Sequence, residues 1–360
     1  MAITLNQHKE NITKKVIGRF SDSVAPKLGL SSWFPAEVTT SKQVSIEVER
    51  NRGLIAVDVE RGTEGNMNTF GKHSEKIYVP PFFKEKFNFA DLDVYERTFG
   101  SNMAPGANEY VSMLRTAGDK LNVLRNKILR AKEKQRAQAL QTGIVEMKNG
   151  DSVDFKRKAD ALVDLGAGNY FGETGVDILN TIAEGVKFLK RDGKSASTTF
   201  DVICGSRAIG AIMNDEKILK KLDNQNINIG SLGTSRFDNT TGLVYHGRLV
   251  LRNGAIDLWT YEDTYENPDG SYSEYITDNN VVLLPRDFVG KHAHAGVPAI
   301  IRDKGNAEFP EWISYEATEF YINNYVDPRA AAHMFEIMSA PLAIPFSVDR
   351  IWTAKVLANV

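Results

Sequence analysis

The sequence contains a single cysteine, Cys204, among its 360 residues, so no intrachain disulfide can form. It has no run near the roughly 20 apolar residues that a membrane-spanning helix needs. Its polar start, MAITLNQHKENITKK, lacks the apolar core of a signal peptide. Neither sign of charge dominates, because 44 basic residues oppose 46 acidic ones. These absences predict a chain that is made in a cytoplasm, stays soluble, contacts no membrane and does not bind nucleic acid tightly over its whole surface.

Signatures of catalysis and metal binding are missing as well. The Gly-rich residues 166–172 lack the Gly-Lys-Ser/Thr ending of a phosphate-binding loop, and we interpret 165–175 as a flexible connector at a domain boundary. His292 and His294 have no partner at zinc-site spacing, so we expect an exposed loop there. We expect Cys204 to be a buried structural thiol rather than a nucleophile. We therefore predict no catalytic residue, no cofactor, no metal site and a structural role.

The most distinctive stretch covers residues 107–142, which we predict to form one long helix. Apolar residues at helical spacing mark one face: Val111, Leu114, Leu121, Leu124, Ile128 and Ala131. About 35 residues would make a rod of roughly 50 Å. The opposite face carries only Asp119 and Glu133 against eight basic residues: Arg115, Lys120, Arg125, Lys127, Arg130, Lys132, Lys134 and Arg136. We expect a solvated basic face, with contact to acidic neighbouring subunits or nucleic acid as the alternative.

A long two-stranded arm precedes this helix. Residues 45–49 and 54–60 alternate as half-buried strands do, residues 61–68 form a polar Gly-containing tip, and residues 74–81 return. Because a lone hairpin buries too little surface to be stable, the arm needs a partner, and a second copy of the chain is the simplest candidate. The alternative is an ordinary hairpin folded onto its own domain. Phe82, Phe83, Phe87 and Phe89 then form a predicted core cluster.

After the helix, the Asn-Gly turn within residues 143–155 predicts a short hairpin. Helical periodicity and apolar runs then alternate, which favours an α/β or α+β domain with a buried sheet. We predict helices over 176–189, 206–213 and 215–222, and strands over 200–204, 243–245, 248–251, 256–261, 281–285, 313–318 and 335–340. The last alternating run, 351–357, is expected to close a sheet begun near residue 40.

Three stretches together resemble one protein family. They are LRAKEKQRAQALQTGIVEM with its hairpin, FDVICGSRAIGAIMNDEKILKKLD with the downstream GLVYHGRLVLRNGAIDLWTY and TDNNVVLLP, and FEIMSAPLAIPFSVDRIWTAKVLA. In this order they resemble the major capsid proteins of tailed bacteriophages, and more narrowly the lambda-type capsid protein E family, which has the Hong Kong 97-type fold. The resemblance extends over nearly the whole chain from about residue 33.

The resemblance implies an α+β fold with an N-terminal arm, an extended β-hairpin loop, a peripheral domain with a long spine helix, and an axial domain. By it, residues 1–32 are the arm and 48–88 the extended loop over a neighbouring subunit. The peripheral domain comprises 33–47, 89–174 with the spine helix 107–142, and 309–360, whereas 175–308 form the axial domain. Arg61, Gly62, Glu64, Gly65 and Asn66 at the loop tip, and Arg125, Arg130 and Lys134 on the helix, become the candidate assembly residues.

The family's function is structural and not enzymatic. The resemblance implies a subunit that assembles with copies of itself, through pentamers and hexamers, into an icosahedral or prolate shell. That shell would enclose double-stranded DNA without sequence-specific binding. It further implies a separate scaffolding protein, a portal, an optional decoration protein, and a virion capsid assembled in the host cytoplasm. An encapsulin-like compartment with protein cargo, or a soluble enzyme with an unrecognised site, are the alternatives.

Overall fold

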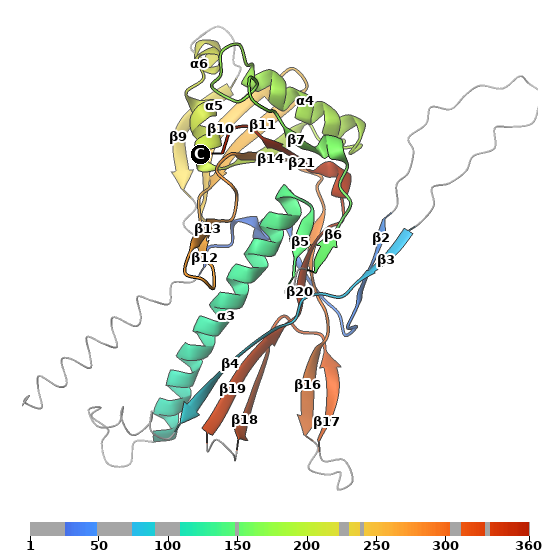
Figure 1. Ribbon diagram of the computed structural model, residues 1–360, viewed down its shortest axis with the longest axis vertical. Coiled ribbons are helices and arrows are strands. Elements are labelled where there is room, and N and C mark those ends of the chain that lie inside the picture. Colours follow the sequence, from blue (N-terminus) through green and yellow to red (C-terminus); the bar gives the residue numbers. More distant parts are fainter. Residues whose placement is uncertain are drawn as a thin grey trace, which may run out of the picture.

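The computed structural model describes residues 26–48, 74–90, 109–147, 151–222, 230–237, 241–302, 311–327 and 332–359. Figure 1 shows an elongated molecule whose long helix, α3 (Glu109–Gln141), runs from a thin sheet at one end to a larger α/β body at the other. The predicted helix over 107–142 is therefore confirmed within the described part. None of the helices described is both long and apolar enough to span a membrane.

The helix ends where its sequence changes character. Gly143 follows α3 with a φ of 72°, and its N–H donates to the Gln138 carbonyl at 3.1 Å. A left-handed glycine commonly ends a helix because it has no Cβ to strain. Here a side chain would also collide with Arg157. The chain then turns directly into the predicted Asn-Gly hairpin, formed by β5 (Ile144–Glu146) and β6 (Ser152–Asp154).

The α/β body is built on a seven-stranded mixed sheet. Its strands, in spatial order, are β7 (Leu162–Asp164), β21 (Trp352–Lys355), β14 (Asn280–Pro285), β8 (Thr199–Cys204), β11 (Gly254–Tyr261), β10 (Leu243–Leu251) and β9 (Gly230–Phe237). The run 281–285 lies inside this sheet, between β21 and β8, as its fully apolar sequence predicts. Two 3-10 turns, η3 (Ala159–Ala161) and η4 (Val348–Arg350), precede β7 and β21.

Three helices cover one face of this sheet (Figure 1): α4 (Ile178–Arg191), α5 (Ser206–Met213) and α6 (Glu216–Leu222). They match the predicted helical segments. Apolar residues of α4 and α5 form one buried cluster with Phe200 and Val202 of β8 and with Leu258 of β11. Asp177 begins α4 by accepting a hydrogen bond from the Asn180 N–H at 3.1 Å.

Smaller sheets connect the body to α3. One contains β1 (Ala36–Val38), β15 (Gly290–His294) and β20 (Pro341–Pro345), and another, packed along α3, contains β18 (Tyr321–Asp327), β19 (Ala332–Ser339) and β4 (Phe83–Ala90). The hairpins are β2 (Val44–Val48) with β3 (Ser74–Tyr78), β12 (Thr264–Glu266) with β13 (Tyr272–Glu274), and β16 (Val297–Arg302) with β17 (Glu311–Glu316). The pairing of β2 with β3 confirms the base of the predicted arm, whereas residues 49–73 lie outside the described part.

Two predictions about strand pairing and core packing are wrong. The run 351–357 does not join the sheet begun near residue 40, because β21 pairs with β14 and β7, and it is β20 that reaches β1 through β15. Alternation identifies a half-buried strand but not its partner. The prediction that Phe82, Phe83 and Phe87 lie in a core is wrong too, because Phe82 is 47% exposed and Phe83 and Phe87 are only half-buried. The sheet that contains β4 packs against α3.

Candidate assembly elements and a buried polar junction

The predicted assembly residues fall into two groups. Arg61, Gly62, Glu64, Gly65 and Asn66 lie outside the described residues. Their stem, β2 with β3, projects from the side of the molecule in Figure 1. No other strand of the described part pairs with this hairpin. Ile77 and Val79, at its base, are 59% and 49% exposed. An exposed apolar hairpin base of this kind is suited to a contact with another surface.

The three basic residues on the helix do not form one free face. The Arg125 guanidinium lies 5.3 Å from the centre of the Phe320 ring, and the Lys134 ammonium lies 5.1 Å from the centre of the Tyr265 ring. Arg130 lies half-buried between these positions. Contacts of this geometry with aromatic rings attract a cation modestly. Arg125 is still exposed, so it is available to a neighbour.

The prediction of a solvated basic face is wrong near the C-terminal end of α3. Lys132 and Glu133 are fully buried and Arg136 is 6% exposed. This part of the helix enters the body and packs against η1 (Gly29–Trp33) and β20. Because an unpaired buried charge is costly, each of the three must have a partner.

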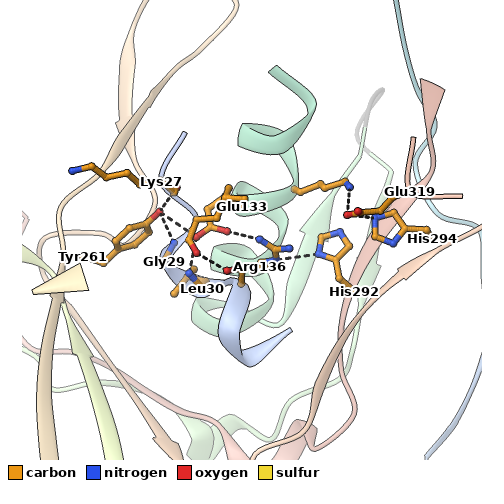
Figure 2. A network of polar contacts seen from close by, with 12 residues as sticks. Lys27, Gly29, Leu30, Glu133, Arg136, Tyr261, His292, His294 and Glu319 are labelled. Carbon is orange, nitrogen blue, oxygen red and sulfur yellow. Dashed lines mark hydrogen bonds and ion pairs between the residues drawn. The ribbon is translucent and has the colours of Figure 1, made fainter. Parts of the chain in front are cut away.

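Glu133 is the centre of the first set of contacts (Figure 2). Its carboxylate accepts hydrogen bonds from the Leu30 N–H at 2.7 Å and from Arg136 Nη1 at 2.7 Å. The Tyr261 hydroxyl lies 3.1 Å from both the Glu133 carboxylate and the Lys27 carbonyl, so its single proton serves one of them at a time. Burial raises the pKa of Glu133, and the Arg136 charge opposes that effect. These contacts fix the start of the described chain to α3 and to β11.

The two histidines lie on the other side of Arg136, and the expectation of an exposed loop is wrong. Both belong to β15 and are fully buried. Arg136 Nε donates to His292 Nδ1 at 3.1 Å, so this imidazole is neutral with its proton on Nε2. Burial, then the nearby Arg136 charge, holds the pKa of His292 well below its usual range. The alternating sequence Lys-His-Ala-His is compatible with a strand, but it does not reveal that both faces are covered.

His294 continues the network to the surface. Its Nε2 lies 3.7 Å from the Glu319 carboxylate, which accepts a hydrogen bond from Lys132 Nζ at 2.9 Å. Lys132 also lies 4.0 Å from the centre of the Phe320 ring. Burial lowers the pKa of Lys132 to about 8 and that of His294 to about 4. Figure 2 shows the arrangement, with Glu133 between Tyr261 and Arg136, and with His292, His294 and Glu319 on the other side of Arg136.

The network therefore connects segments that are far apart in the sequence, and we name it the polar junction: Lys27, Leu30, Lys132, Glu133, Arg136, Tyr261, His292, His294 and Glu319. Sequence reasoning missed it. Glu133 offered one signal, as the only acidic residue among the basic residues in the last turns of the predicted helix. Within the described ranges, no three His, Cys, Asp or Glu side chains are grouped to hold a metal ion.

The other residues considered for catalysis or phosphate binding have structural roles. Cys204 is fully buried in the α/β body, which raises the pKa of its thiol to about 12 and confirms the prediction of a buried thiol. The Gly-rich residues 165–175 connect β7 to α4, and both of these elements belong to the α/β body, so the prediction of a domain boundary here is wrong. These Gly-rich residues are anchored by the buried Phe171, whose N–H donates to the Val356 carbonyl at 2.9 Å. The Asp177 carboxylate occupies the start of α4, the place where a phosphate would otherwise bind.

A comparison with known protein families shows which family the chain belongs to. Residues 21–356 match the family described as phage major capsid protein E. The chain belongs to the phage major capsid protein E family. That match extends from the last residues of the predicted arm to the strand β21, and so includes α3, the polar junction and the seven-stranded sheet.

A solved structure shares the fold of this chain. A prophage protein of E. coli CFT073, described as a capsid protein, has a TM-score of 0.57 at 14% identity and covers 96% of this chain and 99% of its own. The capsid of cyanophage A-1(L) has a TM-score of 0.48 at 12% identity, covering 92% and 93%. The SrpI encapsulin of Synechococcus elongatus PCC 7942 has a TM-score of 0.45 at 9% identity, covering 93% and 91%. No curated protein matches the chain by sequence.

Membership of the phage major capsid protein E family gives the described elements their context. The protein is a phage major capsid protein with the α+β, Hong Kong 97-type fold, and it is a component of the virion capsid. For such a protein the relevant surfaces are those that meet other subunits. The polar junction, being buried, positions these surfaces relative to one another.

Proposed function

We propose that the protein assembles with copies of itself, through pentamers and hexamers, into the closed icosahedral or prolate shell around the double-stranded DNA of a tailed phage, and that it has no enzymatic activity. Its family membership supports a capsid role. The observation that carries the proposal is the projecting hairpin of β2 and β3, which has an exposed apolar base and no strand partner within the described part of its own chain. A lone hairpin becomes stable when it packs on another surface.

The proposed roles of the segments follow the predicted domains. Residues 48–82 are the extended loop that lies over a neighbouring subunit, with Arg61, Gly62, Glu64, Gly65 and Asn66 at its tip. The predicted end of this loop at residue 88 is too late, because β4 pairs with β19 in the sheet along α3. Residues 175–308 are the axial domain, whose loops meet at the centre of each capsomer. The remainder from residue 33 is the peripheral domain, except that β7 and β21 pair into the seven-stranded sheet of the axial domain. Residues 1–32 are the arm. Arg125, Arg130 and Lys134 contact a neighbour or the enclosed DNA along α3.

Assembly takes place in the host cytoplasm. A separate scaffolding protein guides it, a portal occupies one vertex, and a decoration protein is an optional component of the outer surface. Many weak contacts between subunits act together in such a shell, so no single contact has to be strong.

The experiment deletes residues 60–76 and joins the ends of the hairpin with a short Gly-Ser turn. We expect a subunit that folds, shown by an unchanged far-ultraviolet circular dichroism spectrum, but that forms no closed shells in negative-stain electron microscopy. A matched control replaces Lys187 and Arg191 by Arg and Lys, which leaves the hairpin and the charges intact and should assemble. Normal shells from the deletion variant would remove the hairpin from its proposed role.

A further inference from the structure

The two flanks of the α/β body carry opposite charge. Residues 262–278, which comprise β12, β13 and their flanking turns, contain six acidic residues and no basic one. The six are Glu262, Asp263, Glu266, Asp269, Glu274 and Asp278. We name this segment the acidic flank. All but Asp263 and Asp278 are exposed.

The carboxylates of the acidic flank are only partly neutralised within the subunit. Lys27 lies near Asp263, and Lys134 lies over Tyr265. Burial, and then the nearby Asp278 carboxylate, raise the pKa of Glu274, as expected where negative charges are crowded. Tyr272 projects from the same hairpin and is 73% exposed. An exposed aromatic ring among carboxylates is suited to a guanidinium or ammonium partner.

A basic surface lies at the other end of β11, beside the turn that joins β10 to β11. The C-terminal end of α4 and the turn between β10 and β11 are held together by Lys190 Nζ, 2.5 Å from the Asn253 carbonyl, and by Arg252, 2.9 Å from Glu184. We name this surface the basic flank. It presents five basic against two acidic side chains: Lys187, Lys190, Arg191, Lys194 and Arg252 against Glu184 and Asp192. Lys187, Arg191 and Arg252 have side chains that are 61% to 65% exposed.

The two flanks face away from each other. The strand β11 runs from the basic flank to the acidic flank, and its eight residues span roughly 25 Å at about 3.3 Å per residue. Figure 1 shows β12 and β13 on one side of α3, and α4 on the other side, the one from which β2 and β3 project. The basic flank therefore lies on the side on which the hairpin would reach a neighbour.

Around a cyclic axis, each subunit contacts the next through two different patches, one on each flank. We infer that the basic flank of one subunit binds the acidic flank of the next copy of the chain within a capsomer. This inference rests on the proposed function, because it assigns the charges to a ring contact. Opposite charges on the two flanks favour the head-to-tail order and oppose head-to-head pairing, in which like charges would meet.

The test is a charge swap. Lys187→Glu with Arg191→Glu changes the net charge of the basic flank from +3 to −1. On the acidic flank, Lys replaces the four exposed carboxylates, Glu262, Glu266, Asp269 and Glu274, and changes the net charge from −6 to +2. Each set of changes alone should raise the protein concentration needed for assembly at least about tenfold, because like charges then meet. The two sets combined should restore assembly, because opposite charges meet again. Lys187→Arg with Arg191→Lys is the matched control and should assemble as the wild type does.

Assembly is measured by sedimentation velocity and negative-stain electron microscopy, and folding by the thermal midpoint of the subunit. If either variant unfolds early, the neutral changes Lys187→Gln with Arg191→Gln, or Glu262→Gln with Glu266→Gln, replace it and should weaken assembly less strongly. Wild-type shells together with unaffected single-flank variants, or with a combined variant no better than these, would overturn the flank contact and leave the proposed function standing. A wild-type protein that never assembles would contradict both the flank contact and the proposed function.

Discussion

Acidification should weaken the polar junction, because its two histidines are buried in neutral form. His294 has a side chain that is 1% exposed, and burial lowers its pKa from 6.5 to about 4, with the nearby Lys132 charge acting in the same direction. A histidine in the unfolded chain keeps its ordinary pKa. The unfolded state therefore binds more protons than the folded state between pH 6.5 and 4, and the free energy of unfolding falls as the pH falls through this window.

The size of the effect follows from the two pKa values of His294. Linkage gives a loss of about 2 kcal/mol at pH 5 and about 3 kcal/mol at pH 4 relative to neutral pH. The pKa of His292 is lowered as well, so this histidine adds to the loss. Protonation would also abolish the acceptor that His292 Nδ1 offers to Arg136 Nε. Among the residues that the structure describes, the charged groups that act on the pair are Lys132 and Arg136 of α3 and Glu319 of the segment before β18.

The assay is urea unfolding of the subunit at pH 7, 6, 5.5 and 5, followed by tryptophan fluorescence. The comparison is with the double variant His292→Asn, His294→Gln, whose amide oxygens accept hydrogen bonds but do not titrate. Burial raises the pKa of Glu133, so this group increases the free energy of unfolding as the pH falls, but it does so in both proteins. The wild type should lose stability more steeply than the variant. Equal slopes between pH 6.5 and 5 would refute the argument that these histidines are buried and neutral.

Two further predictions concern buried groups. Glu133→Ala should lower the free energy of unfolding by about 3–5 kcal/mol, because it leaves Arg136 buried without its carboxylate partner. Trypsin should then cleave after Lys27 faster, because the Leu30 N–H loses its acceptor. The control is Glu37→Gln at an exposed position, which should lower the free energy of unfolding by less than about 1 kcal/mol. Unchanged stability and proteolysis of Glu133→Ala would show that the acid does not anchor the chain near Leu30. Cys204 should not react with a thiol reagent until the protein is unfolded, since the thiol is fully buried and has a pKa of about 12. A stoichiometric reaction in native buffer would contradict this placement.

The parts of the fold that the sequence predicts are those with local signals. The apolar spacing along α3, the Asn-Gly turn between β5 and β6, and the uninterrupted apolar run of β14 each depend on neighbours in the chain. Their elements are confirmed for this reason. The family resemblance, carried by the order of three stretches, is confirmed by the match over residues 21–356.

The errors arise where tertiary contacts decide. Lys132, Glu133 and Arg136 have the sequence signature of a solvated face, but the body of the protein surrounds that end of α3. The prediction of an exposed loop at His292 and His294 is wrong because Arg136, the partner of His292, lies 156 residues away in the sequence, where no local pattern reveals it. The predicted pairing of 351–357 with the sheet begun near residue 40 is wrong for a similar reason, since alternation carries no information about which strand is the partner.

The central claim, that the chain is a shell-forming subunit, is tested most directly by the mass of the purified protein in solution, measured by sedimentation velocity and viewed by negative-stain electron microscopy. The account predicts closed shells, or rings of five or six subunits, at high concentration or with a scaffold partner. A uniform 40.0 kDa monomer that neither crowding nor a scaffold partner changes would contradict it.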